Sequence, residues 1–381
     1  EPDDSFRDNL DPFYHRTQLR VKELGKDFIG RDWLANEVVS ELKKIGNSED
    51  KDDDEDDQGE TKQTNQSSLS VASQFVVIYG DSGTGKSAFI SRLLDSTFCT
   101  NKGKSWEHLH QRILARHVCQ VQDNDTLDPL KWAQSLAGQI FLAVSGVGKM
   151  QEALAVGGHK DPEGFANWIE KEDSVRTILK EWVIPLLSND SVAKALALKY
   201  IIVIDSFDEA LTHTVVGGTS KDTIVSYLLE FRTKWPAWIS FIATSRPDVA
   251  TKTILKPLTG ASIDVKDSRN LHDIRTFVEI SLESGFRLGK EGAYQSTNIF
   301  LSRVLQCQEL KEMLDVKSRN VLNKAPMCRN WHLWQPGTID LICDKADGVF
   351  MYVQELLQQL NEDPFLDLEA VPEGLAELYM E

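Results

Sequence analysis

An eight-residue segment, G-D-S-G-T-G-K-S, has the residue types and the spacing that phosphate binding requires. It comprises Gly80, Asp81, Ser82, Gly83, Thr84, Gly85, Lys86 and Ser87, and it matches the pattern G-x-x-x-x-G-K-[ST] in full. The glycines allow the backbone to curl so that successive N–H groups point at an anion near the N-terminus of a helix. Lys86 would then supply a positive charge for β- and γ-phosphates, and the Ser87 hydroxyl would be a ligand for Mg²⁺.

The context of this segment decides between a phosphate loop and a glycine-rich turn that binds nothing. The apolar run Phe75–Tyr79 precedes it, and a helix-like stretch, Ala88–Leu94, follows it. Strand, loop and helix in this order favour the phosphate loop. A second segment, Ser145–Lys149, resembles half of the pattern, but Ala143 replaces its leading glycine and Met150 replaces its hydroxyl residue. We therefore expect one phosphate loop.

A cluster of carboxylates follows the most apolar run of the chain. Ile201–Ile204 has no polar interruption and ends in Asp205, which we expect to hold Mg²⁺, with a helix-capping carboxylate as the alternative. Asp208 and Glu209 follow within five residues of it. One of the two could orient or deprotonate the attacking water, while the other only begins a helix; the spacing does not say which.

A further apolar run ends in Thr244, Ser245, Arg246 and Pro247. An arginine at the end of such a strand can form charge-assisted hydrogen bonds to a γ-phosphate and sense its loss on hydrolysis. An ordinary surface ion pair is the alternative for Arg246. The guanine-reading pattern N-K-x-D is absent from the sequence, which favours adenine over guanine.

The elements that must position these residues alternate between strands and helices. Strands are expected at Phe75–Tyr79, Ile113–Cys119, Tyr200–Ile204 and Ile239–Thr244, with long helical stretches between them. This alternation predicts an α/β fold with a doubly wound, mainly parallel P-loop sheet. Beyond residue 265 the strand signal fades, and helices are expected at Leu271–Leu282, Ile299–Met313 and Thr338–Leu360. The sheet is therefore expected to be followed by a smaller helical domain.

The remaining boundaries follow from charge and periodicity. Residues 1–26 are charged, show no regular pattern and are treated as a separate N-terminal segment, and residues 27–265 form the predicted nucleotide-binding domain. Within it, one face of a helix carries apolar residues at positions 33, 34, 38, 39 and 42. The polar tract at 49–74 is expected to be a disordered acidic insertion. Residues 266–360 form the predicted helical domain, and 361–381 follow it.

Composition limits the classes of partner. Of the net charge of −17, −8 comes from residues 49–60, which hold nine acidic residues and one lysine. The mildly acidic remainder gives no support to nucleic-acid binding, which needs clustered Lys and Arg. The five cysteines have no C-x-x-C spacing, so we expect reduced thiols in a cytoplasmic protein. No membrane segment is expected, and because the chain begins at Glu1, we expect it to be a piece of a longer protein.

Taken in order, the motifs resemble the NACHT branch of the STAND signalling ATPases. They are Phe28-Ile29-Gly30-Arg31, the loop Gly80–Ser87, I-I-V-I-D-S-F-D-E-A at 201–210, and F-I-A-T-S-R-P at 241–247. Ser206, a small residue, follows Asp205, where AAA+ enzymes typically have glutamate. Further matches at 115–119, 126–129, 270–274 and 346–352 are most similar to NACHT modules of TANC, nephrocystin-like and ankyrin-repeat proteins. The resemblance covers residues 27–381.

The resemblance implies roles for individual residues. Phe28, Ile29, Gly30 and Arg31 would lie near the adenine and ribose, and the helical domain would fold over the nucleotide. Relatives present a proline to the base, whereas Val349-Phe350-Met351 has none here. Residues 361–381 resemble the lead-in to a winged-helix domain, which would be truncated in this piece.

These observations predict a nucleoside triphosphatase, with ATP favoured, of low turnover. It would bind ATP or ADP with Mg²⁺ between the sheet and the helical domain, and its nucleotide state would control conformation and self-association in a larger multidomain protein. Other protein partners would bind through flanking domains. Two alternatives are a scaffold that binds nucleotide without hydrolysing it and an ATPase that remodels nucleic acids. The acidic surface and the missing adjacent glutamate disfavour the second.

Overall fold

A computed structural model describes residues 10–25, 29–46, 74–196, 200–212, 222–283, 336–362, 368 and 370–373. The described residues divide into two compact units. The first contains most of the chain up to Val265, and the second contains residues from Lys266 onward together with Ile29–Arg31 and Asp81–Gly85. Three segments of the sequence-based interpretation lie outside the described residues: nearly all of the acidic insertion, the helix expected at Ile299–Met313, and most of 361–381.

The first unit contains a five-stranded sheet in which all paired strands are parallel. Its order is β2-β3-β4-β1-β5. The strands are β1 (Phe75–Tyr79), β2 (Ile113–Val118), β3 (Ile201–Asp205), β4 (Ser240–Ser245) and β5 (Thr259–Asp264). The predicted α/β class is confirmed, and the four predicted strands differ from the observed ones by at most one residue at an end.

Strand β5 was not predicted. Its sequence, T-G-A-S-I-D, contains one large apolar residue, Ile263, which is also its only buried residue. The strand lies at the edge of the sheet beside β1, where one face and one edge need not be covered by apolar side chains. The apolar periodicity that identifies a central strand is therefore missing from it.

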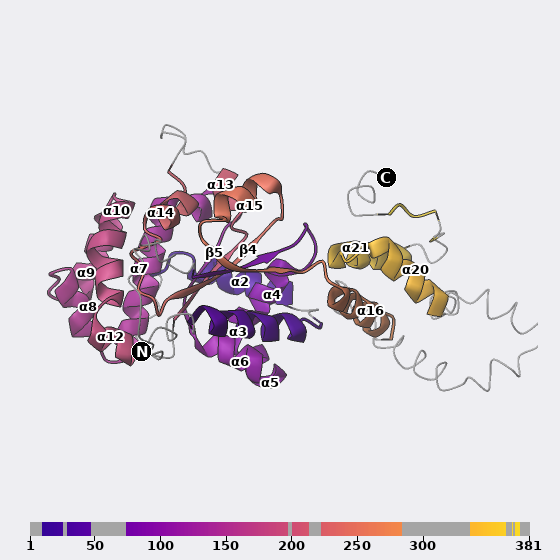
Figure 1. Ribbon diagram of the computed structural model, residues 1–381, viewed down its shortest axis with the longest axis horizontal. Coiled ribbons are helices and arrows are strands. Elements are labelled where there is room, and N and C mark those ends of the chain that lie inside the picture. The colour runs from indigo at the N-terminus through magenta and orange to yellow at the C-terminus, as the bar shows by residue number, and fades with distance from the viewer. Residues whose placement is uncertain are drawn as a thin grey trace, which may run out of the picture. The chain divides into compact units, whose positions relative to one another are not determined.

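Both faces of the sheet are buried, because alternate side chains of its central strands enter two different apolar clusters. On β1, Val77 enters one cluster and Val76 the other; on β3, Ile202 and Val203 are divided in the same way. Helix α3 (Asp32–Gly46) and the helices between β1 and β2 cover the Val76 face, while the helices after β2 cover the Val77 face (Figure 1). This arrangement explains why the central strands are continuously apolar.

The helices and short helical turns of the first unit have the following bounds. On the Val76 face, after α3, they are α4 (Lys86–Leu94), α5 (Ser96–Lys102) and α6 (Lys104–Gln111). Between β2 and β3 they are η2 (Asn124–Leu127), α7 (Pro129–Gly146), α8 (Met150–Val156), α9 (Pro162–Lys171), α10 (Val175–Thr177), η3 (Ile178–Val183), α11 (Ile184–Leu187) and α12 (Asp190–Ala195). Later in the chain they are α13 (Glu209–Thr212), α14 (Ile224–Glu230) and α15 (Val249–Leu255).

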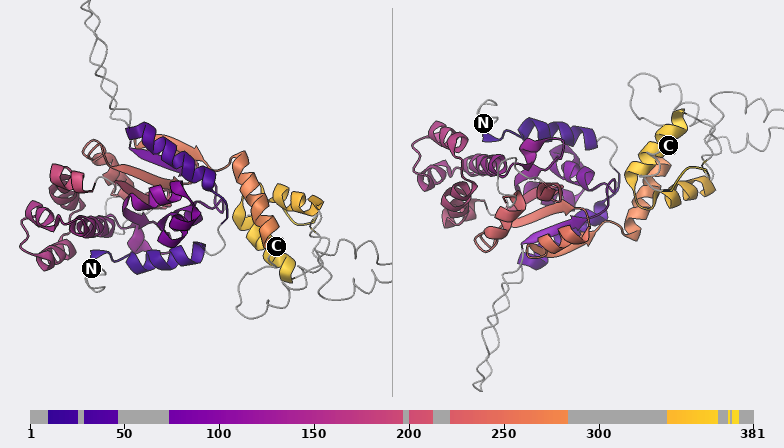
Figure 2. Two further views of the ribbon diagram at one scale, coloured as in Figure 1. Left: turned by 90° about the horizontal axis from the view of Figure 1, so that it is seen from below. Right: turned by 90° about the horizontal axis from the view of Figure 1, so that it is seen from above.

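Helix α2 (Tyr14–Gly25) corrects the interpretation of residues 1–26 as irregular. Most of its residues are polar or charged, but Thr17 and Val21, together with Phe13 just before the helix, form a narrow buried stripe at helical spacing. The helix packs along α4, and a side chain added at Gly25 would lie 3.0 Å from the guanidinium carbon of Arg92. Figure 2 shows α2 and α3, both indigo, well apart from one another in each view.

The second unit contains α16 (Ser268–Glu283), α20 (Pro336–Ala346) and α21 (Phe350–Glu362), which share one apolar cluster. The helix predicted at Leu271–Leu282 is confirmed by α16. The helix predicted at Thr338–Leu360 is instead two helices, because Asp347 and Gly348 have positive φ angles of 40° and 84°. The buried amide of Asn270 donates to the Gly348 carbonyl at 2.8 Å, which fixes this break.

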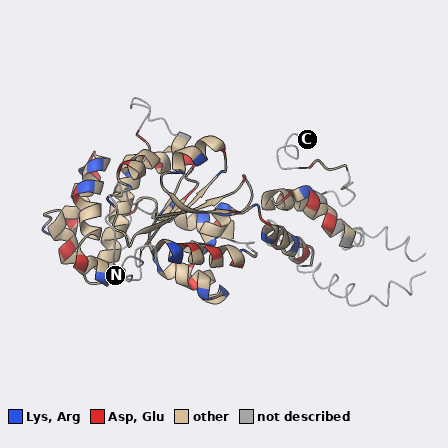
Figure 3. Cartoon of the chain, viewed as in Figure 1, with Lys and Arg blue, Asp and Glu red and all other residues tan. Residues whose placement is uncertain are grey.

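Charged side chains of both signs are interspersed along the helices of the first unit (Figure 3). Among the described residues, Cys99, Cys119 and Cys343 are free thiols. None of the described helices combines the length and apolar character that crossing a membrane would require.

Candidate functional site: the carboxyl edge of the sheet

The loop after β1 lies where neighbouring connections of the sheet leave in opposite directions. From β1 the chain crosses to β2 on one side, and from β4 it crosses over β1 to β5 on the other. Ligands of open α/β sheets bind at the carboxyl ends of strands beside such a switch point. The order of the strands therefore places the end of β1 and the end of β4 at the position where a ligand is expected.

The backbone of the loop has the curled shape that its glycines permit. Gly83 and Gly85 have φ angles of 77° and 88°, a region that other residues rarely adopt. The buried Thr84 closes the turn, because its hydroxyl donates to the Asp81 carbonyl at 2.8 Å. The Lys86 ammonium donates to the Gly80 carbonyl at 2.6 Å and so lies back along the loop. The chain then enters α4 at Lys86, and Ser87 lies in its first turn.

The middle of the loop is held by residues of the second unit. The Met351 N–H donates to the Gly83 carbonyl at 3.1 Å, and the Arg31 guanidinium donates to the Thr84 carbonyl. The Arg31 guanidinium also lies over the Phe350 ring, 5.0 Å from its centroid. Asp81–Gly85 therefore group with the second unit, while Gly80 and Lys86 belong to the first.

Gly30 and Arg31 form a strained turn anchored by a carboxylate. Their φ angles are 77° and 66°, and the Arg31 N–H donates to Asp273 at 3.0 Å. Arg31 is only 1% exposed, and burial lowers its pKa to about 10, an effect that Asp273 opposes. Arg31 thus contacts the loop that follows β1, and its assignment to the adenine and ribose stays a prediction. Ile29 packs beside the second unit's cluster, and Phe28 lies outside the described residues.

Asp205 is a buried carboxylate with a precise orientation. It is 1% exposed, and one of its oxygens accepts a hydrogen bond from Thr244 at 2.6 Å. The same Thr244 hydroxyl accepts from the Ser206 N–H at 2.8 Å, and Ser206 has a φ of 57°. The other oxygen of Asp205 lies 3.9 Å from the guanidinium of Arg20 on α2. Thr244 therefore orients the carboxylate predicted to hold Mg²⁺.

Asp208 and Arg246 lie together, as the predicted site requires. The Arg246 N–H donates to one Asp208 oxygen at 3.1 Å, and its Nε lies 3.2 Å from the other. Half of the Arg246 side chain is exposed, whereas that of Asp208 is 12% exposed. The structure thus shows the ion pair that was the alternative for Arg246, at the predicted edge of the sheet, and its contact with a γ-phosphate stays a prediction.

Glu209 begins α13 and accepts a hydrogen bond from the Val121 N–H at 2.6 Å. Burial raises the pKa of its carboxyl group, the Val121 hydrogen bond opposes this effect, and the negative charge of Asp208 adds to it. A carboxyl group with a raised pKa is a suitable general base. Burial, and then the negative charge of Asp205, raise the pKa of the Cys119 thiol well above its usual range. That thiol is therefore an unreactive core group.

The oxygen atoms at this edge suit Mg²⁺ only in combination with a phosphate ligand. Among the described residues, no three His, Cys, Asp or Glu side chains gather into a metal site. Mg²⁺ commonly binds proteins through one or two side-chain oxygens while phosphates and water complete its octahedron. The Ser87 hydroxyl and the Asp205 carboxylate are such hard oxygen donors, so they fit a metal ion that arrives with a nucleotide.

Comparison with known families supports one part of the sequence-based resemblance. Residues 57–246 match the family model described as nephrocystin 3, N-terminal. This part of the chain is similar to the nephrocystins. The nephrocystin-like segment contains β1 to β4, the loop Gly80–Ser87, Asp205 and Arg246. The match with the family model confirms the nephrocystin-like resemblance, whereas assignment to the NACHT ATPases remains a prediction. No curated protein matches the chain.

Sequence reasoning missed two residues that contact the site. Arg20 was overlooked because its helix was overlooked; the stripe of Phe13, Thr17 and Val21 would have revealed α2. Asp273 was noted only as part of a matching segment, and its contact with Arg31 spans 242 positions of the chain. No local pattern reports a contact of that separation.

Proposed function

We propose that the chain binds ATP with Mg²⁺, hydrolyses it slowly, and works as a signalling switch of the NACHT type. One observation carries the proposal: a curled G-x-x-x-x-G-K-S loop follows β1 at the switch point, and the buried Asp205 ends β3 in the same parallel sheet. Phosphate would be bound by loop N–H groups and Lys86. Mg²⁺, held by Ser87 and Asp205, would neutralise charge on the phosphates.

The contacts of the loop support a role as a switch. Its middle is held by Arg31 and Met351 of one unit, and its two ends belong to the other unit. A bound nucleotide that reorders the loop would therefore change its contacts with Arg31 and Met351. Loss of the γ-phosphate would also remove contacts to Arg246 and to the Asp208–Glu209 region, and the conformation would shift accordingly.

The function of the whole protein would follow from this conformational change. In the proposal, the nucleotide state controls self-association of a larger cytoplasmic protein. Light scattering on the chain loaded with a non-hydrolysable ATP analogue or with ADP measures this directly. A larger mass with the ATP analogue supports the proposal, and equal masses with both nucleotides contradict control of self-association by this part of the chain.

Binding is tested by removing the charge of the loop. Lys86→Ala should abolish binding of a fluorescent ATP analogue in the presence of Mg²⁺. Lys149→Ala is a matched control, because Lys149 ends the half-pattern Ser145–Lys149 and pairs with Glu152 at 2.8 Å. Unchanged affinity in Lys86→Ala, or equal losses in the two variants, would contradict the phosphate-binding assignment.

A scaffold that binds nucleotide without hydrolysis is the second candidate. It is favoured because both possible bases already bond to other groups of the protein. Asp208 pairs with Arg246, and Glu209 accepts from the Val121 N–H. Nucleotide released from the purified, denatured chain, together with a phosphate-release assay, separates the two functions. Bound ADP and measurable phosphate release support the switch, whereas bound ATP without release supports the scaffold.

A further inference from the structure

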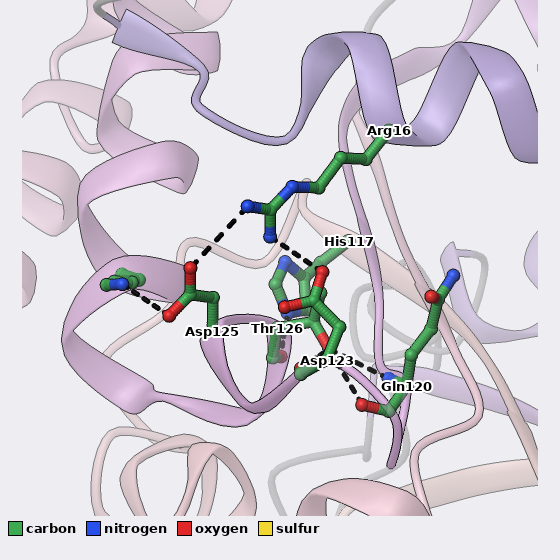
Figure 4. A network of polar contacts seen from close by, with 7 residues as sticks. Arg16, His117, Gln120, Asp123, Asp125 and Thr126 are labelled. Atoms are coloured by element: carbon green, nitrogen blue, oxygen red, sulfur yellow. Dashed lines mark hydrogen bonds and ion pairs between the residues drawn. The ribbon is translucent and has the colours of Figure 1, made fainter.

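Helix α2 presents two arginines to the acidic edge of the sheet. Arg16 and Arg20 are four residues apart and therefore lie on the same face of the helix. Arg16 donates to Asp123 at 2.6 Å and lies 3.6 Å from Asp125, both in the segment after β2 (Figure 4). Helix α2 packs along α4, and this packing holds Arg20 beside the edge of the sheet.

Arg20 lies beside the carboxylates of the candidate site without being fully bonded to the protein. Its Nη2 is 3.9 Å from Asp205, which is beyond hydrogen-bond distance, and its charge also opposes the raised pKa of Glu209. The Nε atom has no hydrogen-bond partner among the described residues, and 28% of the side chain is exposed. A guanidinium group with unused donors in a site for phosphates is suited to bidentate binding of phosphate oxygens.

Arg246, at the same edge of the sheet, makes more contacts with a carboxylate than Arg20 does. Arg246 already donates its N–H to Asp208 and holds the same carboxylate through Nε. Arg20 has a single long contact with Asp205. Of the two guanidinium groups, Arg20 can turn toward a ligand with the smaller loss of existing hydrogen bonds.

We propose that Arg20 contacts the terminal phosphate of a bound nucleoside triphosphate and makes the site prefer triphosphate over diphosphate. The inference rests on the proposed nucleotide binding and adds α2 to the site. Arg20 lies 3.9 Å from Asp205, the residue that would hold Mg²⁺ beside the phosphates. A diphosphate lacks the group that Arg20 would bind, so the arginine contributes selectivity as well as affinity.

The test compares dissociation constants for a non-hydrolysable ATP analogue and for ADP, both with Mg²⁺, on the whole chain. Arg20→Gln should weaken binding of the ATP analogue about tenfold or more, as expected when one charge-assisted hydrogen bond is lost, and should change ADP affinity little. Arg20→Lys keeps the charge but not the fork and should lie between. Arg16→Gln is the matched control, because it removes an ion pair from the same face of α2, and both affinities should be retained.

The outcomes separate this inference from the proposed function. If the unaltered chain binds neither nucleotide, both are overturned. If it binds both and Arg20→Gln keeps the same ratio of affinities, only the role of Arg20 is overturned. If Arg16→Gln changes the ratio as much as Arg20→Gln, the effect comes from displacement of α2, and the inference also fails. Thermal unfolding without nucleotide checks that each variant is folded.

Discussion

The hydroxyl group of Thr244 donates to Asp205 Oδ1 at 2.6 Å, across the boundary between β4 and β3. The hydroxyl oxygen of Thr244 in turn accepts from the Ser206 N–H at 2.8 Å. One buried threonine thus orients the candidate metal carboxylate and stabilises the left-handed backbone of the residue that follows it. The end of β3 is therefore held in place by the neighbouring strand β4.

Thr244→Val should destabilise the fold by about 2–3 kcal/mol, because it leaves a buried carboxylate and a backbone N–H without their partner while preserving side-chain volume. Urea denaturation measures the free energy of unfolding. Thr244→Ser is the control, because it keeps the hydroxyl group and should cost only about 1 kcal/mol for the lost methyl group. Equal losses in the two variants would show that packing, and not the hydrogen bonds, determines the effect.

Glu209→Gln should retain nucleotide binding and slow hydrolysis by about 10²-fold or more, because its raised pKa suits a general base. Asp208→Asn should slow hydrolysis less, because its main contact is with Arg246. Single-turnover phosphate release measures both rates. For the unaltered chain, the rate should fall with decreasing pH as the Glu209 carboxylate becomes protonated. Normal turnover in both variants would remove the two residues from the mechanism.

Gly30→Ala should cost about 3 kcal/mol or more. A methyl group at this position would overlap the Asp273 carboxylate, which accepts from the Arg31 N–H, and the φ angle of 77° is unfavourable for alanine. Gly148→Ala is a close control: its φ is 76°, but no atom lies within 4 Å of the added methyl group. That variant should lose only the conformational cost of about 1–2 kcal/mol. Chemical denaturation provides both values, and equal losses would contradict the predicted overlap.

The buried His117 should make stability depend on pH. Its Nε2 donates to the Thr126 carbonyl at 2.7 Å, and burial lowers its pKa from 6.5 to about 4 (Figure 4). The unfolded chain binds a proton near pH 6.5 and the folded chain only near pH 4, so stability is lost as pH falls through this interval. Between pH 7 and pH 5.5 the loss should be about 1 kcal/mol.

His117→Gln keeps a side-chain donor but does not titrate. Its free energy of unfolding should therefore change less between these two pH values than that of the unaltered chain. Parallel changes in the two proteins would show that other groups cause the pH dependence.

Local patterns were sufficient for the central strands. Phe75–Tyr79 was predicted with its observed bounds, because a strand covered on both faces must be apolar throughout. Helix α3 was recognised because its apolar residues recur on one face, which packs on the sheet. By contrast, β5 and α2 have weak patterns, because one lies at the edge of the sheet and the other buries only a narrow stripe.

The sequence by itself determined which residues could bind phosphate and Mg²⁺. The glycines, the lysine and the serine of the loop are close together in the chain, so their spacing can be recognised without the rest of the fold. The tertiary structure alone decided how these residues are supported. Thr244 meets Asp205 only because β4 pairs with β3, and Arg20 reaches the same carboxylate only because α2 packs along α4. Such contacts depend on strand order and helix packing, which arise from burial summed over the whole sheet and leave no trace in the spacing of any one segment.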